Sequence, residues 1–433
     1  MSAQTVGSRG GADSPSPPAQ SHAPAAPSLA DYEPLIGRSA LDELGLLAEK
    51  LRGRRVCCIN ATRVGGGVAE ILNRMVPLVG ELGVAMRWEI LKGTESFYKV
   101  TKKMHNALHG KTEPFTPEMF DLFRENTRRN LQELDLDAEL FFIHDPQPIA
   151  LVEDRKRLGG RWVWRCHIDV SNPQRDVWNF LRPYILQYDT GVYSAPAYVQ
   201  QLPLRQVLIA PSIDPLSDKN RDLPDETVQA IVRRLEVRTD WPLITQISRF
   251  DYLKDPLGVV DAFRLVRKSM RCRLLLAGGS ADDDPEGQEV LNLVRERVQD
   301  DPDIQILLLP PDSHVEINAL QRASTVVLQK SLREGFGLTV SEALWKGRPV
   351  VASAVGGIPL QIKHGYSGLL VHSIEGAARA IKQLLRNPDF AARLGQNGRE
   401  HVRQHFLLTR QIRDYLLTFA TLGLDQDVVH FGT

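Results

Sequence analysis

Short apolar runs recur along this chain, and each is followed by a longer amphipathic stretch. Runs rich in β-branched residues predict buried strands, and the stretches between them predict helices. Strands that alternate with helices form βαβ units, whose strands lie parallel in one sheet. The rhythm begins after Leu51 and restarts at Leu243, so the sequence predicts an α/β protein with two parallel sheets. The expected strands are 55–60, 140–143 and 162–166 in the first series, and 243–247, 273–277, 304–308, 325–328 and 349–352 in the second.

The length of 433 residues supports the same division, because one hydrophobic core rarely serves so long a chain. We expect two Rossmann-like domains at 29–212 and 213–403, separated near the proline-containing stretch 209–215. Residues 1–28 are rich in Pro, Ala, Ser and Gly and predict a disordered tail. The last segment, 404–433, is expected to be helical and to pack back on the first domain.

Overall charge selects no partner for the chain. Its 53 basic and 53 acidic residues balance, so no broad field attracts nucleic acid or an anionic membrane. No apolar run approaches the roughly 20 residues of a membrane span, and the first residues do not resemble a secretory signal. The four cysteines form no C-x-x-C pair, which favours reduced thiols over zinc ligands. These features predict a cytoplasmic protein.

The segment 333–342, REGFGLTVSE, carries the most chemistry for its length. It follows the strand 325–328 and opens a helical pattern, so free backbone N–H groups are expected near Leu338 and Thr339. Such a helix start binds phosphate, and Gly335 and Gly337 let a ligand approach the backbone closely. Glu334 precedes the helix and Glu342 lies about one turn inside it, so the two acids can hold different hydroxyl groups.

Two further segments suit an anionic ligand. Arg249 and Lys254 follow the strand 243–247, at the carboxyl end where open α/β sheets place their ligands. Opposite the start of the helix at Leu338, a forked arginine and a point-charge lysine would neutralise a diphosphate. The glycine run at 65–67, which joins the first strand to a helix, allows N–H groups to converge on an anion.

Polar residues also follow two strands of the first domain. His167 and Asp169 come directly after the strand 162–166, and Asp145 and Gln147 follow the strand 140–143. A cleft between two parallel sheets gathers residues from such strand ends. We therefore expect these four side chains to line the cleft and to bind hydroxyl groups.

These motifs carry a family resemblance over roughly residues 50–410. Arg-x4-Lys at 249–254, Glu-x7-Glu at 334–342, the glycine run and the histidine after the strand follow the order seen in retaining nucleotide-sugar glycosyltransferases of the GT-B fold. More narrowly, four segments resemble the trehalose glycosyltransferring synthases, which join glucose from a nucleotide sugar to free glucose. The segments are TKKMHNAL at 101–108, HDPQP at 144–148, WRCHID at 164–169 and EALWKG at 342–347.

The resemblance implies a role for each motif. A donor site for UDP-, ADP- or GDP-glucose would be built by Gly65, Gly66, Gly67, Arg249, Lys254, Glu334, Gly335, Phe336, Gly337, Leu338, Thr339 and Glu342. Among these, Arg249 and Lys254 would hold the diphosphate, Glu334 the transferred glucose and Glu342 the ribose. His167 would contact the donor sugar near its 6-hydroxyl, and the acceptor site would comprise Asp145, Gln147, His167 and Asp169. His167, Glu334, Arg249 and Lys254 would carry catalysis.

The same resemblance implies a retaining transfer that makes α,α-trehalose without a metal cofactor. Magnesium is not predicted by any motif, and the sequence leaves the nucleobase, the preferred direction and a homodimer open. Trehalose phosphorylase is the nearest alternative activity. Transfer to glucose 6-phosphate is another, for which Lys102, Lys103 or Arg175 would supply the extra cations. An inactive nucleotide-sugar sensor is disfavoured because the four catalytic candidates are intact.

Overall fold

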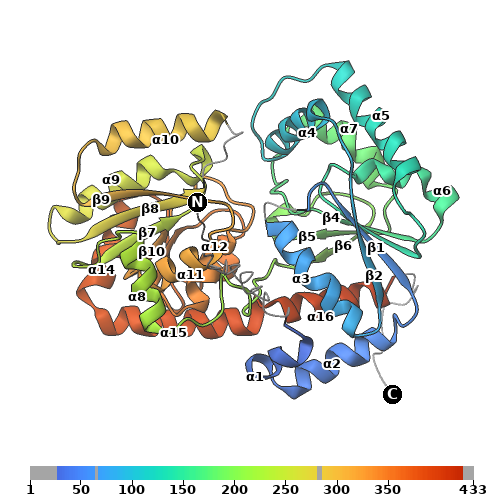
Figure 1. The fold of residues 1–433 in the computed structure, drawn as a ribbon. Helices are drawn as coiled ribbons and strands as arrows, with labels where there is room; N and C mark the ends of the chain where they lie inside the picture. Colours follow the sequence, from blue (N-terminus) through green and yellow to red (C-terminus); the bar gives the residue numbers. More distant parts are fainter. Residues whose placement is uncertain (1–26, 64–66, 280–284, 423–433) are drawn as a thin grey trace, which may run out of the picture.

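The computed structural model describes residues 27–63, 67–279 and 285–422, which form two lobes side by side (Figure 1). Each lobe is built on a six-stranded sheet in which every pair of neighbouring strands is parallel. The first sheet has the order β2-β1-β3-β4-β5-β6 and the second the order β12-β11-β10-β7-β8-β9. This confirms the two Rossmann-like parallel sheets expected from the sequence.

The first domain covers both faces of its sheet with helices. Its elements are η1 Leu29–Tyr32, α1 Glu33–Ile36, α2 Arg38–Glu49, β1 Arg55–Asn60, α3 Gly67–Glu81, β2 Ala85–Ile90, α4 Glu95–Leu108, α5 Pro117–Glu133, β3 Leu140–His144, η2 Ile149–Asp154, α6 Arg155–Leu158, β4 Arg161–Arg165, α7 Arg175–Ile185, β5 Thr190–Tyr193, η3 Pro196–Tyr198 and β6 Arg205–Leu208.

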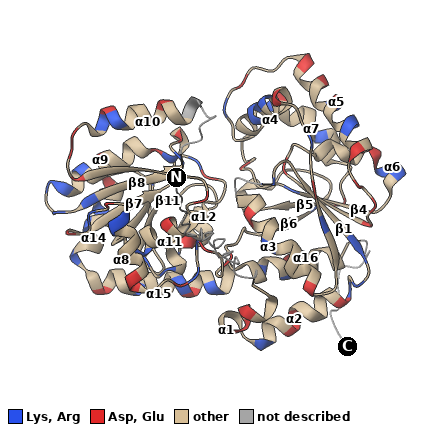
Figure 2. Cartoon of the chain, viewed as in Figure 1, with Lys and Arg blue, Asp and Glu red and all other residues tan. Residues whose placement is uncertain are grey.

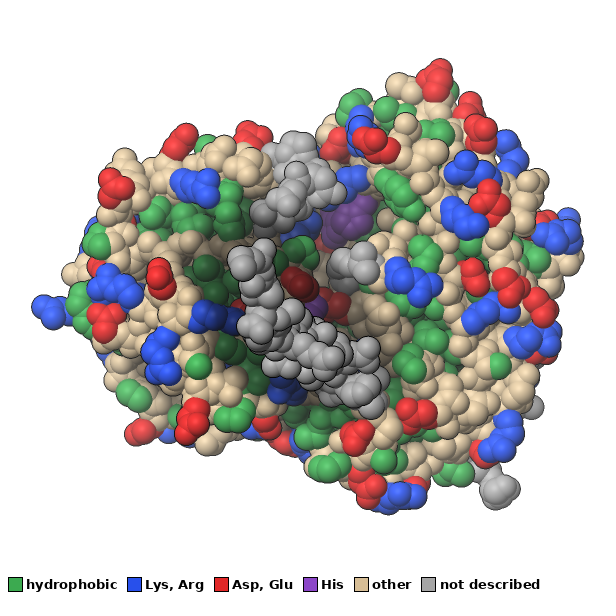
Figure 3. Space-filling view, in the orientation of Figure 1, with side chains coloured by type: hydrophobic (Ala, Val, Ile, Leu, Met, Phe, Trp, Pro, Cys, Tyr) green, Lys and Arg blue, Asp and Glu red, His purple; other side chains and the backbone are tan. Residues whose placement is uncertain are grey.

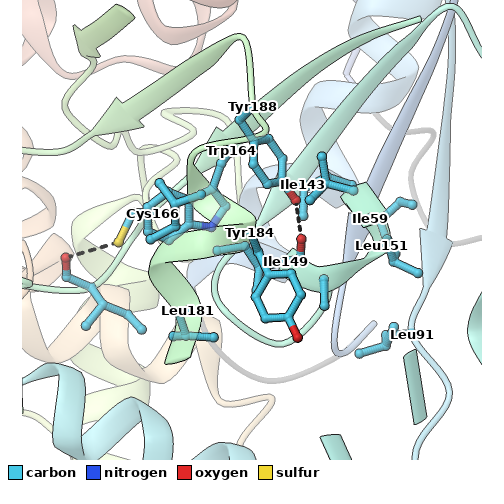
Figure 4. Packing of buried hydrophobic residues seen from close by; sticks show 14 of the residues in the cluster. Ile59, Leu91, Ile143, Ile149, Leu151, Trp164, Cys166, Leu181, Tyr184 and Tyr188 are labelled. Atoms are coloured by element: carbon cyan, nitrogen blue, oxygen red, sulfur yellow. Dashed lines mark hydrogen bonds between the residues drawn. The ribbon is translucent and has the colours of Figure 1, made fainter. Parts of the chain in front are cut away.

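One face of the first sheet packs on α4, α5 and α7, in a core rich in aromatic side chains (Figure 4). Trp164 and Ile143 lie in this core beside Tyr188, whose hydroxyl donates a hydrogen bond to the Ile149 carbonyl at 2.7 Å. Because a buried phenol needs such a partner, the bond fixes the turn that follows β3. This turn carries Asp145 and Gln147.

The second domain repeats the pattern. Hydrophobic side chains of α9, α10 and α14 cover one face of the sheet, and those of α8, α11, α12 and α15 cover the other. Its elements are α8 Asp225–Arg234, β7 Leu243–Ile247, η4 Tyr252–Lys254, α9 Pro256–Arg267, β8 Arg273–Gly279, α10 Pro285–Val298, β9 Ile304–Leu309, α11 His314–Ala323, β10 Val326–Gln329, α12 Leu338–Trp345, β11 Val350–Ser353, α13 Ile358–Gln361, β12 Leu369–Val371, α14 Ile374–Arg386 and α15 Pro388–His405.

The chain crosses between the lobes twice. After β6 it enters the second domain, and after α15 it returns as α16 (Leu408–Ala420), which lies beneath the first sheet (Figure 1). Phe419 and Tyr415 of α16 pack edge-on against Phe142 of β3. The two crossings are joined by backbone hydrogen bonds of 2.9 Å, because Ile213 donates to the Phe406 carbonyl and accepts from the Leu408 N–H.

The start of the described chain is tied to the same crossing. Ser28 forms a capping box with Asp31 at the beginning of η1. The buried Tyr32 donates from its hydroxyl to Asp214 at 2.8 Å, and Arg74 of α3 donates to the other oxygen of Asp214 at 2.7 Å. Residues from Ser28 onward therefore belong to the folded domain, and residues 1–26 of the expected tail lie outside the described residues.

Candidate active site

The site lies between the lobes, where the carboxyl ends of strands from both sheets meet. Parallel strands end at one edge of a sheet, so the loops after β3 and β4 approach those after β7 and β10. The space-filling view shows a hollow between the lobes, with histidine, acidic and basic side chains inside it (Figure 3). Positions of Lys, Arg, Asp and Glu are spread along the helices and loops of both lobes (Figure 2).

Glu334 and Lys254 form an ion pair on the second-domain side of the hollow. The Lys254 ammonium lies 2.6 Å from Oε2 of Glu334, and the Ser331 hydroxyl donates to the same oxygen at 3.2 Å. Glu334 is 9% exposed, so its charge depends on these two donors. The pair places a cation and an acid at one point of the hollow, where both could contact a charged sugar donor.

Arg249 is held less tightly. Its guanidinium lies 3.2 Å from the Asp251 carboxylate, and its side chain is 57% exposed. An exposed arginine keeps rotamer freedom and donors for a ligand. The structure therefore places Arg249 close to Lys254 in the segment after β7, with most of its guanidinium donors open to a ligand.

Two helix starts meet across the domain boundary. Gly337 has φ +81°, which turns the chain into α12 at Leu338 and Thr339. A Cβ atom at Gly67, the first residue of α3, would lie 2.9 Å from Cδ1 of Leu338. The positive ends of α3 and α12 thus converge, as an anion site requires. Gly65 and Gly66 lie outside the described residues.

Gly335 and Phe336 bring the two domains together. A Cβ atom at Gly335 would lie 3.3 Å from the carbonyl oxygen of His167, and Phe336 is buried against Phe406. The hydroxyl of Tyr198, in the first domain, donates to the carbonyl oxygens of Gly335 at 2.6 Å and Glu334 at 3.1 Å. Sequence reasoning missed Tyr198, because its role depends on a contact across domains.

Glu342 lies inside α12, eight residues after Glu334, and is 6% exposed. Oε1 of Glu342 lies 3.9 Å from the ammonium of Lys219, which also contacts both carboxylate oxygens of Glu70 at 2.9 Å. Burial opposes the charge of Lys219, but Glu342 and Glu70 outweigh burial and raise its pKa. Lys219 was missed by sequence reasoning, because it looked like one more charge in a polar connecting segment.

A pocket of about 750 Å³ opens beside Glu342. Its lining includes Gly67 and Glu70 of α3, Lys219 of the connecting segment, His314 of α11 and Leu338 of α12. Arg249, Lys254 and Glu334 lie outside this lining, so the pocket adjoins the ion pair without containing it. The arrangement separates a nucleoside-sized space from the charged centre.

His167 is partly exposed, and its ring is held by a second histidine. Nε2 of His167 lies 3.0 Å from Nδ1 of the buried His144, and the two rings are nearly parallel. Burial lowers the pKa of both imidazoles, and the neighbouring Arg165 acts in the same direction. Both rings are therefore neutral at physiological pH. His144 ends β3 and was included in a motif without a role.

The Asp145 carboxylate is occupied within the protein. Its Oδ1 accepts a hydrogen bond from the backbone N–H of His167 at 2.9 Å. The backbone of Asp145 itself has φ +65°. Burial raises the pKa of Asp145 to about 6, although the His167 N–H lowers it. Asp145 thus holds the backbone of His167, and its role as a hydroxyl binder remains a prediction.

Asp169 and Gln147 differ in whether their side-chain oxygens have hydrogen-bond partners within the protein. Oδ1 of Asp169 accepts from the Ser171 N–H at 2.9 Å and from the Ser171 hydroxyl at 2.6 Å. Oε1 of Gln147 is buried and has no hydrogen-bond partner among the described residues. Among the residues expected to bind hydroxyl groups, Gln147 therefore offers a side-chain oxygen that no described residue occupies.

Comparisons with known proteins agree with this architecture. Residues 58–200 match the family model for the N-terminal domain of trehalose synthase, and residues 228–401 match that for group 1 glycosyltransferases. In its fold, the chain is similar to the sucrose-phosphate synthase of Thermosynechococcus elongatus, with a TM-score of 0.69 and 19% identity over 85% of this chain and 99% of that one. The fold and the site define a glycosyltransferase of the GT-B class.

The sequence relatives narrow the class. The trehalose synthase of Rubrobacter xylanophilus is 46% identical over 404 residues, which cover 91% of this chain and 97% of that protein. The chain therefore belongs to the trehalose synthase family. A more distant relative, the trehalose phosphorylase of Pleurotus pulmonarius, is 29% identical over 79% of this chain and 54% of its own length.

No described helix is long and apolar enough to cross a bilayer. Within 27–63, 67–279 and 285–422, no three His, Cys, Asp or Glu side chains gather as a metal site.

Proposed function

We propose that this enzyme transfers glucose from a nucleoside diphosphate glucose to free glucose and forms α,α-trehalose with retention. The observation that carries the proposal is the buried Lys254–Glu334 pair, which lies across from His167 and just before the start of α12. Membership of the trehalose synthase family supports the choice of sugars.

The leaving group is stabilised by fixed positive charge. As the bond between the anomeric carbon and the phosphate oxygen breaks, negative charge develops on the diphosphate. Lys254, Arg249 and the N–H groups at the start of α12 stabilise that charge where it forms. This electrostatic support needs no reorganisation at the moment of reaction, because Lys254 is already held by Glu334.

Glu342 and Glu334 have separate tasks in the proposal. Glu342, at the edge of the 750 Å³ pocket, accepts hydrogen bonds from the ribose. Glu334 accepts from hydroxyl groups of the transferred glucose, and His167 contacts that glucose from the first domain. The backbone of Gly335 lies against the backbone carbonyl of His167, so the segments that carry Glu334 and His167 meet at this point.

The proposed retention comes from the family resemblance, and the state of the nearby carboxylates is compatible with it. Glu334 is paired with Lys254, while Asp145 and Asp169 accept hydrogen bonds from their own loops. None of the three is placed as a free nucleophile, which disfavours a double displacement. With retention assumed, the acceptor attacks on the face that the phosphate leaves. The acceptor oxygen bonds to the anomeric carbon, and its proton passes to the departing phosphate oxygen.

The test is product analysis by NMR after incubation with UDP-, ADP- or GDP-glucose and glucose. We expect a non-reducing α,α-disaccharide and strongly impaired transfer by His167→Ala with nucleotide binding retained. A β-linked or reducing product would overturn the assignment.

Two further reactions separate the alternatives. The similarity to a trehalose phosphorylase makes phosphate-dependent breakdown of trehalose the second candidate. We expect neither trehalose breakdown with inorganic phosphate alone nor faster transfer to glucose 6-phosphate than to glucose. Either result would replace the proposed reaction with the corresponding alternative.

A further inference from the structure

Helix α4 presents a polar stripe that the proposed chemistry has not used. Tyr98, Lys102, His105 and His109 are spaced by four, three and four residues, so they share one side of the helix. The opposite side, which includes Phe97 and Met104, is buried in the core of the first domain. The polar stripe therefore faces away from that core.

The end of the stripe touches the second domain beside the ion pair. Arg333, the residue before Glu334, donates from its guanidinium to the His109 carbonyl. A Cβ atom at Gly110 would lie 2.6 Å from the same guanidinium and 2.7 Å from the Asn172 carbonyl. The carboxyl end of α4 thus lies in contact with both the loop that holds Glu334 and the loop that follows Asp169.

The two histidine rings are arranged as a pair. Their centroids lie 4.7 Å apart with an angle of 61° between the planes. Nδ1 of each ring is buried and has no hydrogen-bond partner among the described residues. Because an unpaired buried N–H costs more than an unpaired lone pair, each ring carries its proton on Nε2.

Burial favours the neutral form of both rings. Burial lowers the pKa of His105 to about 3, and His109, Lys102 and Arg249 act in the same direction. Burial also lowers the pKa of His109; Asp169 and Glu334 oppose this, while Lys254 and Arg333 add to it. The groups that influence His109 come from both domains. The contact of Arg333 with the His109 carbonyl places this end of α4 beside Glu334, the residue proposed to hold the transferred glucose.

We propose that His105 and His109 form one wall of the acceptor site and donate hydrogen bonds from Nε2 to hydroxyl oxygens of an uncharged hexose. The inference rests on the proposed function, because it assumes that the Lys254–Glu334 side holds the donor. Neutral imidazoles suit hydroxyl groups, whereas a phosphorylated acceptor calls for cations.

The test compares two substitutions at each position. Leucine removes the N–H donor, whereas the amide of glutamine retains a donor close to the Nε2 position. His105→Leu and His109→Leu should each raise KM for glucose by about 3- to 10-fold, the effect of one hydrogen bond. Their Kd for the free nucleoside diphosphate should stay within about twofold of wild type. His105→Gln and His109→Gln should recover most of the loss, and the exposed His372→Leu serves as a control.

A binding measurement complements the kinetics. Saturation-transfer NMR of glucose with UDP present should show a signal for the wild type and the glutamine variants and a weaker one for the leucine variants. An unchanged KM and glucose signal in both leucine variants would overturn the inference and leave the proposed function standing. Loss of nucleotide affinity instead would place the pair on the donor side and overturn it as well. Absence of transfer to glucose by the wild type would overturn the proposed function first.

Discussion

The Lys254 ammonium lies 2.6 Å from the Glu334 carboxylate, although the sequence assigns the two residues to different ligand groups. One residue ends η4 and the other follows β10, so the fold joins two loops of the second domain through this contact. Removing either residue therefore changes both the charge of the site and the stability of its loops.

Lys254→Ala should lower kcat by about 10²- to 10³-fold, because it removes a cation that stabilises the leaving diphosphate. It should also lower the free energy of unfolding, because Glu334 stays buried without its partner. Steady-state kinetics and chemical denaturation measure the two effects. Lys268→Ala, at an exposed position, is the matched control and should change neither.

The double variant Lys254→Ala/Glu334→Gln separates these effects. Glutamine removes the unpaired charge, so stability should recover relative to Lys254→Ala while kcat stays low. A Lys254→Ala enzyme within a few-fold of wild-type turnover would remove Lys254 from the diphosphate site.

The two glutamates should differ in what they affect. Glu342→Ala should weaken binding of the free nucleoside diphosphate, because Glu342 borders the pocket beside α3. Glu334→Gln should lower kcat and spare that affinity, because Glu334 is assigned to the transferred glucose. Titration calorimetry with the nucleoside diphosphate decides between them, and the reverse pattern would contradict the assignment.

His144 should fix the tautomer of His167. Nε2 of His144 is buried without a partner among the described residues, so its proton belongs on Nδ1, which then donates to Nε2 of His167. His167 consequently carries its own proton on Nδ1. Nitrogen-15 NMR of histidine-labelled protein should show that tautomer, and His144→Phe should give a mixture with kcat lowered by about tenfold. A wild-type His167 protonated on Nε2 would contradict this prediction.

Lys346 should make stability depend on pH above neutrality. Burial lowers its pKa from 10.5 to about 7, with Arg322 and Lys219 adding to the effect and Glu342 opposing it. Between these values the unfolded chain binds more protons than the folded one, so the free energy of unfolding rises with pH through this window. Denaturation at pH 7 and pH 9 should show the rise in the wild type and a smaller one in Lys346→Met. Equal pH dependence in both proteins would show that Lys346 titrates normally.

Buried apolar runs were predictable from the sequence, including the four-residue strands β10 and β11, whereas strands with mixed side chains or only three residues were not. The expected strands at 55–60 and 243–247 coincide with β1 and β7, because continuous buried runs carry a strong signal. β2, with the sequence AMRWEI, places charged side chains on an edge strand, and β12 has only three residues. The sequence pattern therefore missed strands whose identity depends on the neighbouring strand.

The candidate site shows the same difference between features that a local sequence pattern predicts and features that it does not. Motif spacing located Glu334 and Glu342, because their separation depends only on the local start of α12. The contacts of Tyr198 with Gly335 and of Lys219 with Glu70 join residues more than one hundred positions apart. No local pattern encodes such pairs, so they became visible only once the two domains were placed together.

The paired crossing at Ile213 and Leu407 restricts how the lobes can move. Two backbone segments linked by hydrogen bonds act as a hinge axis, since twisting or sliding one lobe would break the hydrogen bonds that join them. Opening and closing about that line keeps these hydrogen bonds intact and changes the contacts between the lobes in the cleft, such as those of Tyr198 with Gly335 and of Arg333 with His109. Substrate entry and product exit would thus use one hinge motion, and the catalytic loops would return to the same alignment at every turnover.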